Sequence, residues 1–414
     1  MQPPQQILAS PFTLPNGTLL QNRIVKAAMS EAVGTTDGRP TPGLSVLYSR
    51  WTAGGVGLNI TGNVMIDRRA LGEPNNVVVE NESDLADLRL WANAGTQSGG
   101  QIWMQINHPG KQAPKGLNRE TVAPSVVPLG DGSSVFFTVP RELTPPEIED
   151  IIQRFGKTAA IAKKAGFTGV QLHGAHGYLI SQFLSPHHNR RTDEWGGSAE
   201  KRRRFVLSIF KEVRRQVGDG FPVGIKLNSS DFQRGGFTEE ESLDTIRALT
   251  QAGIDLVEIS GGTYEAPVMT GVRKMKDSTQ KREAYFLEFT EKLRSEIKAP
   301  LMLTGGFRSL SGMADAISSG AVDLVGLARP LAIDPELPRR LLSGQEALVP
   351  VHPISTGVKS LDRMGLLEIT WYTRQLQRMA SGENPKPEES AFCSLAMSVL
   401  TRGWRSFETR RFRA

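Results

Sequence analysis

Apolar and polar positions form two kinds of block along this chain. Short apolar runs bounded by glycine or proline are typical of buried strands, and longer segments with apolar residues three or four positions apart are typical of amphipathic helices. A helical segment follows each short run, and this alternation predicts parallel strands. Eight strands are predicted, at residues 23–29, 57–64, 101–107, 168–173, 222–227, 255–260, 300–304 and 322–326.

Local signals support the helices between these strands. Thr144 and Glu147 have the spacing of a capping box, and Thr238 begins a second one. Repeated strand–helix units in this number favour a closed barrel over an open, doubly wound sheet. A dinucleotide-binding open sheet would have a G-x-G-x-x-G turn after a strand, whereas the glycine-rich run at residues 54–57 precedes one. The predicted fold class is therefore α/β, a (β/α)8 TIM barrel.

The two ends of the chain depart from this alternation. Residues 11–20 carry two apolar runs around Asn16-Gly17, a pair that favours a type I′ turn, and they predict an N-terminal β-hairpin. Residues 354–381 have a helical pattern, and a proline-containing linker follows at residues 384–387. The expected domains are residues 1–345, the barrel, and residues 346–414, a helical C-terminal extension with a basic tail.

Composition excludes several classes of protein. Cys393 is the single cysteine, so the chain has no internal disulfide and no cysteine-ligated cluster or four-ligand zinc site. This fits a reducing, cytoplasmic location. No apolar run reaches about 18 residues, so no transmembrane helix is predicted. The N-terminal residues lack the pattern of a signal peptide, and none is expected.

The net charge of +6 gathers at residues 201–204 and in the C-terminal tail. Because no continuous basic face is indicated, nucleic-acid binding is not predicted. Residues 201–204 are interpreted as the solvated face of a helix. The tail is either solvated or makes a weak contact with an anionic membrane surface or a partner; its arginines are Arg402, Arg405, Arg410, Arg411 and Arg413.

In a TIM barrel, chemistry occurs where the strands end, at their C-terminal side. The residues that the predicted strands place there are Ala28, Met29, Ser30, Gly62, Gln105, His108, His173, His176, Tyr178, Lys226, Gly305, Gly306, Ala328 and Arg329. The small residues after the seventh and eighth strands stand at the usual phosphate site of such barrels, and Arg329 would close it. The pattern therefore predicts a ligand that carries phosphate.

His173 and His176 allow three interpretations. They are metal ligands, structural histidines at a strand end, or a pair of imidazole donors to an anionic oxygen. A metal would need a third ligand, and the sequence offers no suitably placed carboxylate or cysteine, so no metal is expected. The donor pair is the preferred hypothesis, and Tyr178, two residues further on, is then a candidate proton donor. Residues 179–193 are interpreted as the buried support of these side chains.

The stretch HGAHGYLISQFLSPHHNRRTDEWGGSAEKRRRF closely resembles the signature of the old yellow enzyme family of FMN-dependent oxidoreductases. KAAMS, WMQINHPGK, TGGF and LVGLARPLAIDP, at the first, third, seventh and eighth strands, extend the resemblance over residues 7–342. The stretch KLNSSDFQRGGF and the longer C-terminal region are similar to the branch described as NADH:flavin oxidoreductase or NADH oxidase-like.

The resemblance implies a tightly bound, non-covalent FMN across the barrel mouth. The residues it assigns to this cofactor are Ala27, Ala28 and Met29 through backbone groups, Ser30 and Gln105 through hydrogen bonds, Gly62 under the ring, Lys226 near N1, and Gly305, Gly306, Ala328 and Arg329 at the phosphate. It makes His173 and His176 the groups that hold the substrate's oxygen. Lys226 would stabilise negative charge on the reduced ring.

The resemblance also implies a reaction. NAD(P)H would reduce the flavin, and an activated alkene such as an enone, enal, nitroalkene or quinone-like acceptor would then take its place, with Tyr178 as proton donor. Alternatives are an NADH oxidase or flavin reductase without a dedicated alkene substrate, a non-catalytic flavin-binding module, and a flavin-free barrel enzyme for a phosphorylated substrate. The oligomeric state stays open, with a homodimer as one option.

This chain departs from many relatives at two of these positions. Lys226 stands where arginine is common, which keeps the charge but loses the planar fork of a guanidinium. Ser30 stands where cysteine or threonine is common, so redox sensing through a thiol is excluded there. Larger members with an iron–sulfur cluster are also excluded as a type, since one cysteine cannot hold a cluster.

Overall fold

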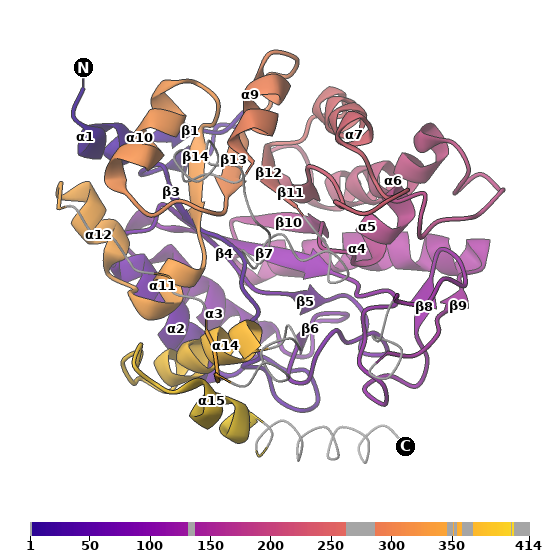
Figure 1. The fold of residues 1–414 in the computed structure, drawn as a ribbon, viewed down its shortest axis with the longest axis horizontal. Coiled ribbons are helices and arrows are strands. Elements are labelled where there is room, and N and C mark those ends of the chain that lie inside the picture. The colour runs from indigo at the N-terminus through magenta and orange to yellow at the C-terminus, as the bar shows by residue number, and fades with distance from the viewer. Residues whose placement is uncertain are drawn as a thin grey trace.

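Eight parallel strands form a closed barrel at the centre of the molecule (Figure 1). The computed structural model describes residues 2–130, 137–261, 286–345, 351, 354–357, 367–398 and 400. In order around the barrel the strands are β3 (Ile24–Lys26), β4 (Leu58–Ile60), β7 (Gln101–Asn107), β10 (Gly169–Gly174), β11 (Val223–Asn228), β12 (Leu256–Ser260), β13 (Leu301–Thr304) and β14 (Leu324–Leu327). The pairing of β14 with β3, in which Val325 lies opposite Ile24, closes the ring.

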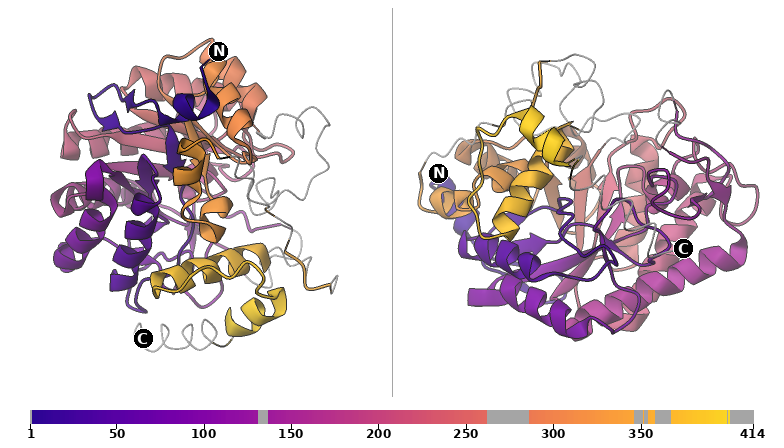
Figure 2. Two further views of the ribbon diagram at one scale, coloured as in Figure 1. Left: turned by 90° about the vertical axis from the view of Figure 1, so that its left-hand side faces the viewer. Right: turned by 90° about the horizontal axis from the view of Figure 1, so that it is seen from below.

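Helices surround this ring, as Figures 1 and 2 show. They are α2 (Pro42–Ala53), α3 (Leu85–Thr96), α4 (Pro145–Ala165), α6 (Ala199–Val217), α7 (Glu239–Gln251), α9 (Leu287–Arg294) and α10 (Leu310–Ser318), with the shorter α5 (Leu179–Leu184), α11 (Arg329–Ile333), α12 (Leu337–Leu342) and the 3₁₀ turn η1 (Gln97–Gly99). Both predicted capping boxes are present, at Thr144 and Glu147 and at Thr238 and Glu241. The (β/α)8 prediction is confirmed.

The barrel interior changes from apolar to charged along its axis. Near the N-terminal ends of the strands, Trp103 is fully buried among Val25, Leu58, Leu256, Met302 and Leu324. Glycines on β10, the neighbouring strand, and on β11, the next strand beyond it, make room for its ring, because a Cβ on Gly169 or Gly224 would lie 2.5 or 2.8 Å from a Trp103 atom. Toward the C-terminal ends, the inward side chains become amide and charged groups. Among the described residues, this change puts buried polar and charged side chains toward the mouth, including Gln105, Lys226 and Glu258.

The predicted N-terminal hairpin is confirmed, but its turn type is wrong. β1 (Phe12–Thr13) pairs antiparallel with β2 (Leu19–Leu20). The turn runs from Leu14 to Gly17, and the Gly17 N–H donates to Leu14 O at 2.9 Å. Gly17 has a φ of 87°, whereas Asn16 does not adopt the positive φ that a type I′ turn requires. Pro15 fixes a negative φ at the second position, which favours an ordinary type I turn. A short helix, α1 (Pro4–Ala9), precedes the hairpin.

The C-terminal extension is helical where the structure describes it. α14 (Leu367–Ala380) packs against α2 and α11, and α15 (Ala391–Ser398) packs against α14 (Figures 1 and 2). The prediction of a helix from residue 354 is wrong at its start, because residues 354–357 are not helical. Gly357 there has a φ of 76°, which a right-handed helix does not accommodate. Residues 401–414, with the predicted basic tail contact, lie outside the described residues.

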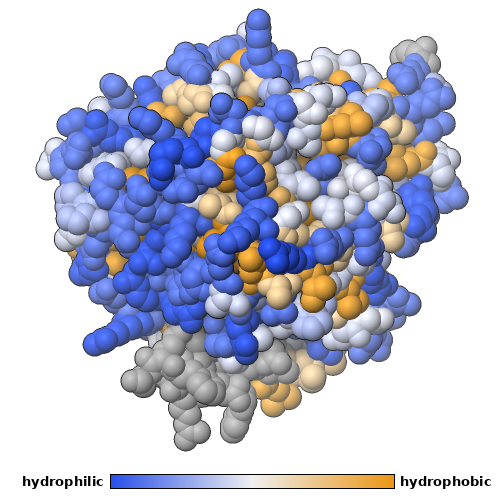
Figure 3. All heavy atoms as spheres, turned by 180° about the vertical axis from the view of Figure 1, so that it is seen from behind, coloured by the Kyte–Doolittle hydropathy of each residue, from blue (hydrophilic) through white to orange (hydrophobic). Residues whose placement is uncertain are grey.

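Smaller strands complete the surface of the mouth. β5 (Val64–Met65) and β6 (Val77–Val78) extend the sheet beside β7, and β8 (Val122–Ala123) pairs with β9 (Arg141–Glu142). Hydrophilic residues predominate on the face drawn in Figure 3, with apolar residues in smaller groups between them. In the part of the chain that the structure describes, no helix combines the length and apolar character needed to span a membrane.

Candidate functional site

The two predicted histidines and the predicted tyrosine come together at the C-terminal end of β10, with His173 on the strand and His176 and Tyr178 just beyond it. The ring centroids of His173 and His176 are 5.2 Å apart, and those of His173 and Tyr178 are 4.8 Å apart. His176 adopts a φ of 62°, and its N–H donates to Asn228 Oδ1 at 3.2 Å. Residues other than glycine rarely adopt this left-handed conformation, and those that do are often found at functional sites. The turn thereby brings both imidazoles to one side of the mouth.

Both histidines are neutral at ordinary pH. Burial, then the neighbouring His176 and Lys226, hold the pKa of His173 well below its usual value. Burial and Lys226 do the same to the pKa of His176. A neutral imidazole has one N–H, so each ring has one donor. The Ala175 N–H donates to His173 Nδ1 at 3.3 Å, which leaves the hydrogen on Nε2.

Tyr178 occupies the residue before α5, and its side chain is 8% exposed. The next residue anchors this helix, because the Leu179 N–H donates to His108 O at 3.0 Å, at the end of β7. All six residues of α5 are buried. Residues 179–185 are thus buried beneath the phenol as expected, whereas Arg190 and Thr192, later in the predicted support of residues 179–193, are exposed.

Lys226 lies in a buried hydrogen-bonded network that the sequence did not predict. Its Nζ is 2.9 Å from Oε1 of Glu258, which is fully buried on the next strand. Thr304 Oγ1 donates to the same oxygen at 2.6 Å. Gln171 Nε2 donates to Glu258 Oε2 at 2.7 Å, and Gln105 Nε2 donates to Gln171 Oε1 at 2.8 Å. The positive charge expected at residue 226 is thus paired with a carboxylate, and Gln105 is tied to the same network.

A second buried cluster lies beside Gly62. Lys26 Nζ is 3.4 Å from Glu31 Oε1, and it donates to Tyr48 OH at 3.1 Å and to Ile60 O at 2.8 Å. Burial lowers the pKa of Lys26 to about 8, although Glu31 opposes this shift. The Gly62 N–H donates to Glu31 Oε1 at 3.0 Å. The one sequence signal of this cluster is a lysine inside an apolar strand, in IVKAA.

Gly62 has no room for a side chain. A Cβ there would lie 2.0 Å from Glu31 Oε2 and 2.2 Å from Met29 O. We expect Gly62→Ala to lower the free energy of unfolding by about 1–3 kcal/mol, the usual effect of overpacking, and to reduce the bound flavin per chain. Chemical denaturation and the visible absorbance of the purified protein measure the two effects. Gly220→Ala is the control, because a Cβ at Gly220 would meet no atom within 4 Å. If both variants lost the same stability and the same amount of flavin, the close packing around Gly62 would not be the cause.

The segment after β3 contains an unsatisfied hydroxyl. The Ala27 N–H still pairs with Leu327 O at 2.9 Å, and Ala28 and Met29 continue beyond the strand. Ser30 Oγ is buried and has no hydrogen-bond partner in the described part of the chain. A buried hydroxyl without a partner is unfavourable, and a ligand that hydrogen-bonds there would satisfy it.

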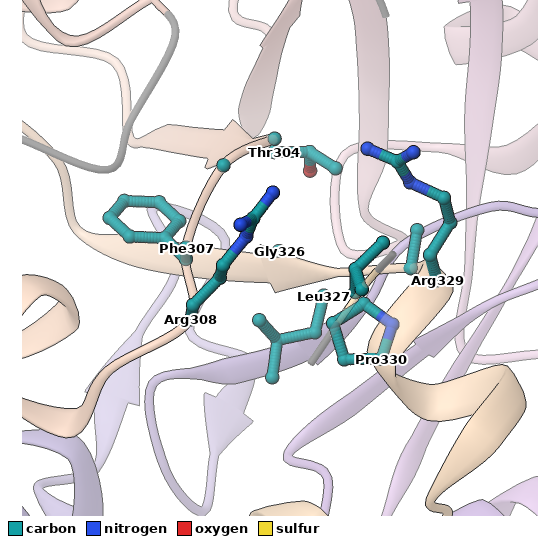
Figure 4. A pocket seen from close by; sticks show the side chains of 11 residues that line it. Thr304, Phe307, Arg308, Gly326, Leu327, Arg329 and Pro330 are labelled. Atoms are coloured by element: carbon teal, nitrogen blue, oxygen red, sulfur yellow. The ribbon is translucent and has the colours of Figure 1, made fainter. Parts of the chain in front are cut away.

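The predicted phosphate residues line one pocket after β13 and β14 (Figure 4). Gly305 and Gly306 have φ values of 119° and 92°, a backbone conformation that favours glycine. Ala328 and Arg329 form the opposite wall, and the hollow has a volume of about 50 Å³. Figure 4 shows that the side chains of Arg308 and Arg329 extend toward the side of the pocket where Thr304 lies. Arg308 was not predicted, since it lies beyond the glycine pair on an exposed turn.

These residues fit FMN. Two arginines and two glycines suit a phosphate dianion, while the unpartnered hydroxyl of Ser30 after β3 and the side chain of Lys226 on β11 suit the polar groups of the ring. Within residues 2–130, 137–261, 286–345 and the described C-terminal residues, no group of three or more His, Cys, Asp or Glu side chains is placed to hold a metal ion.

One interpretation of the basic run at residues 201–204 is wrong. Arg202 is 6% exposed, and its Nε donates to Leu184 O at 2.9 Å. Its other nitrogens bind Gly197 O and the Glu241 carboxylate. The guanidinium therefore joins α5, α6 and the first turn of α7. Lys201 and Arg204 are exposed as expected.

Comparison with known proteins agrees with this geometry. The sequence profile of the NADH:flavin oxidoreductase / NADH oxidase family matches residues 8–347. An NADH-dependent flavin oxidoreductase of Hypocrea jecorina is 40% identical over 360 residues, which cover 81% of this chain and 89% of that protein. The fold is similar to that of 2-naphthoyl-CoA reductase, with a TM-score of 0.75, 29% identity, and coverage of 82% of this chain and 53% of that chain.

The old yellow enzyme homologue from Zymomonas mobilis has a TM-score of 0.71 and 25% identity, with coverage of 83% of this chain and 94% of that chain. The matched region includes every strand of the barrel, the two histidines, the tyrosine and the phosphate-pocket residues named above. The chain therefore belongs to the NADH:flavin oxidoreductase / NADH oxidase family, that of the old yellow enzymes, and is an FMN-dependent oxidoreductase with NAD(P)H as its reductant.

Proposed function

We propose that this enzyme reduces the activated C=C bond of a small electrophile, such as an enone, enal, nitroalkene or quinone-like acceptor. The observation that carries the proposal is the pair of neutral imidazoles at His173 and His176 with the Tyr178 phenol beside them. Such a pair suits an oxygen that gains negative charge during the reaction. The similarity to 2-naphthoyl-CoA reductase supports a substrate with a conjugated carbonyl group.

The cofactor assignments follow the same logic. We infer that residues 1–345 form the FMN-binding domain, with the phosphate at Gly305, Gly306, Ala328 and Arg329. The ring would then lie over Gly62, near Lys226 and Gln105, with Ser30 and the backbone of Ala27, Ala28 and Met29 at its edge. Bound FMN supplies hydride transfer between the nicotinamide and the substrate carbon.

The chain's own residues supply the acid and the electrophilic groups. Nε2–H of His173 and Nδ1–H of His176 donate to the substrate's oxygen and draw electron density from the double bond. The Tyr178 hydroxyl then gives its proton to the carbon next to the activating group. His173 and Tyr178 are buried and His176 is partly buried, which limits the access of water and strengthens these hydrogen bonds.

Anaerobic half-reactions test this function. The enzyme is reduced with NADH, and cyclohexenone, a nitroalkene or buffer is then added while flavin absorbance is followed. We expect reoxidation by the alkenes and a saturated product. If reoxidation by every alkene is as slow as in buffer while oxygen reoxidises the flavin, the enzyme is an NADH oxidase without a dedicated alkene substrate.

Ser260 determines which nitrogen of His176 faces the substrate. Its Oγ lies 2.8 Å from His176 Nε2, on the opposite side of the ring from Nδ1. When the serine hydroxyl donates to Nε2, the ring hydrogen is on Nδ1 and serves as a donor to the substrate. Without that hydroxyl the other tautomer becomes available, and a lone pair would face the substrate's oxygen.

We expect Ser260→Ala to weaken the binding of a phenol inhibitor about tenfold, the effect of one hydrogen bond of about 1.4 kcal/mol. A titration of long-wavelength absorbance with a phenol measures the change, and Ser260→Thr should restore binding. Ser229→Ala is the matched control, since Ser229 Oγ is also buried at a strand end but has no partner in the described residues. Equal affinities for Ser260→Ala and the wild type would disprove the role of Ser260.

A further inference from the structure

The C-terminal helix α14 contacts the segment that carries Ser30, although it lies outside the residues matched by the family profile. Thr373 Oγ1 donates to Ser30 O at 3.3 Å. Gln377 Nε2, one turn further along the same helix, donates to Ala32 O at 3.2 Å. Figures 1 and 2 show α14 beside α2, the helix that follows this segment.

The backbone conformation of Ala32 explains what these two hydrogen bonds stabilise. Its φ is 48°, in the left-handed region, where an alanine is strained. Such a conformation persists only where surrounding contacts hold it. The hydrogen bonds from Thr373 and Gln377 hold the carbonyl groups on either side of Glu31. They therefore fix the direction of the backbone that presents Ser30 to the mouth.

The same helix also contacts the phosphate pocket. Glu368 Oε2 lies 3.3 Å from Arg329 Nη1. Burial raises the pKa of Glu368, because the charged carboxylate loses contact with water. The charge of Arg329 acts in the opposite direction and favours the ionised carboxylate. The Tyr372 hydroxyl, one turn further along α14, is buried without a hydrogen-bond partner among the described residues. The contact to Nη1 leaves the remaining guanidinium N–H groups for another anion.

We propose that α14 is a working part of the FMN site, in which Thr373 and Gln377 position the Ser30 segment and Glu368 positions Arg329. One helix then links the ring end of the cofactor cradle with its phosphate end. The proposal rests on the placement of FMN given above. It assigns a role to the extension that follows the barrel: retention of the cofactor.

Two flavins separate the two ends of the site, because riboflavin has no phosphate. Full-length apoprotein is titrated with FMN and with riboflavin, and the quenching of flavin fluorescence gives each Kd. We expect Thr373→Val/Gln377→Leu to raise Kd for both flavins about tenfold, the combined effect of two neutral hydrogen bonds. We expect Glu368→Ala to raise Kd for FMN by a similar factor, about tenfold, and to leave riboflavin unchanged.

Arg378→Ala is the control on the same helix. Its Nε donates to Asn384 O at 3.2 Å, away from the cofactor residues, and its affinities should equal those of the wild type. If the double variant does not fold, the single variants should each give about threefold weaker binding of both flavins. Far-ultraviolet circular dichroism establishes folding in every case.

Two results would overturn the proposal. One is a folded ring-end variant that binds both flavins as tightly as the wild type. The other is tighter FMN binding by Glu368→Ala, which would make the carboxylate a repulsive neighbour and not a positioning group. Arg329→Met tests the placement of FMN separately. If that variant keeps the wild-type preference for FMN over riboflavin, the assigned phosphate site itself is wrong, whatever α14 does.

Discussion

Tyr178→Phe should slow the oxidative half-reaction with an enone by about 10²–10⁴, the usual contribution of a general acid. The substitution removes the hydroxyl and keeps the ring, whose centroid lies 4.8 Å from that of His173. Reduction of the flavin by NADH needs no proton from this residue, so its rate should stay close to that of the wild type. Stopped-flow absorbance under anaerobic conditions measures both half-reactions separately.

The choice of acceptor supplies the control for this prediction. A quinone accepts hydride and is protonated on oxygen, where solvent can provide the proton, so the Tyr178→Phe enzyme should still reduce it well. Enone reduction needs a proton on carbon, for which the buried site has few alternative sources. If both half-reactions, or enone and quinone turnover, fall by the same factor, Tyr178 supports the fold of the site and is not its acid.

The barrel could be predicted because its signal is local and repeated. Each strand is a short, mostly apolar run, and several helices have clear end signals: α4, α6, α7 and α10 begin after a capping serine or threonine, and α4 and α6 end at a glycine. The residues at the strand ends then follow from the fold, and the structure brings His173, His176 and Tyr178 together as expected. The type of the Leu14–Gly17 turn was missed because Asn16-Gly17 favours one turn while Pro15 favours another.

The buried charge pairs could not be predicted in the same way. Lys226 meets Glu258 across neighbouring strands, and Lys26 meets Glu31 only after the chain turns at the end of β3. A charged residue within an apolar run indicates that a buried partner exists, but the sequence does not identify that partner. Arg202 shows the same limit, since a basic run on a helix looks solvated until the segments that cover it are known. The hydrogen bonds from α14 to the segment of Ser30 join residues more than 300 positions apart, as between Ser30 and Thr373.

Lys226→Met should produce two large effects that differ in origin. It removes the ammonium group that lies 2.9 Å from the buried Glu258 carboxylate. Removing one partner of a buried ion pair lowers the free energy of unfolding by about 3–5 kcal/mol, because the other charge stays buried without compensation. The hydrogen bonds from Gln171 and Thr304 to Glu258 remain, so we expect the lower end of this range. In the proposed placement of FMN, the variant also removes a cation near the ring and leaves an unpaired carboxylate there, which disfavours negative charge on the reduced ring. Its reduction potential should fall by more than about 30 mV, equivalent to ~1.4 kcal/mol for two electrons.

A second variant separates stability from redox tuning. Lys226→Met/Glu258→Gln removes both charges and keeps the size of residue 258. Its amide retains one acceptor oxygen where the carboxylate accepts from both Thr304 and Gln171, so the variant should recover part of the lost unfolding free energy. Its potential should lie between those of the wild type and the single variant, because the ring loses its cation and the repulsive carboxylate together. Denaturation curves and potentiometric titrations with a dye of known potential give the two quantities.

A stability loss without any change in potential would leave the Lys226–Glu258 pair as a structural element and place the flavin's N1 elsewhere. A potential that falls equally in both variants would show that the charge of Lys226 alone acts on the ring, and that Glu258 serves to hold it there.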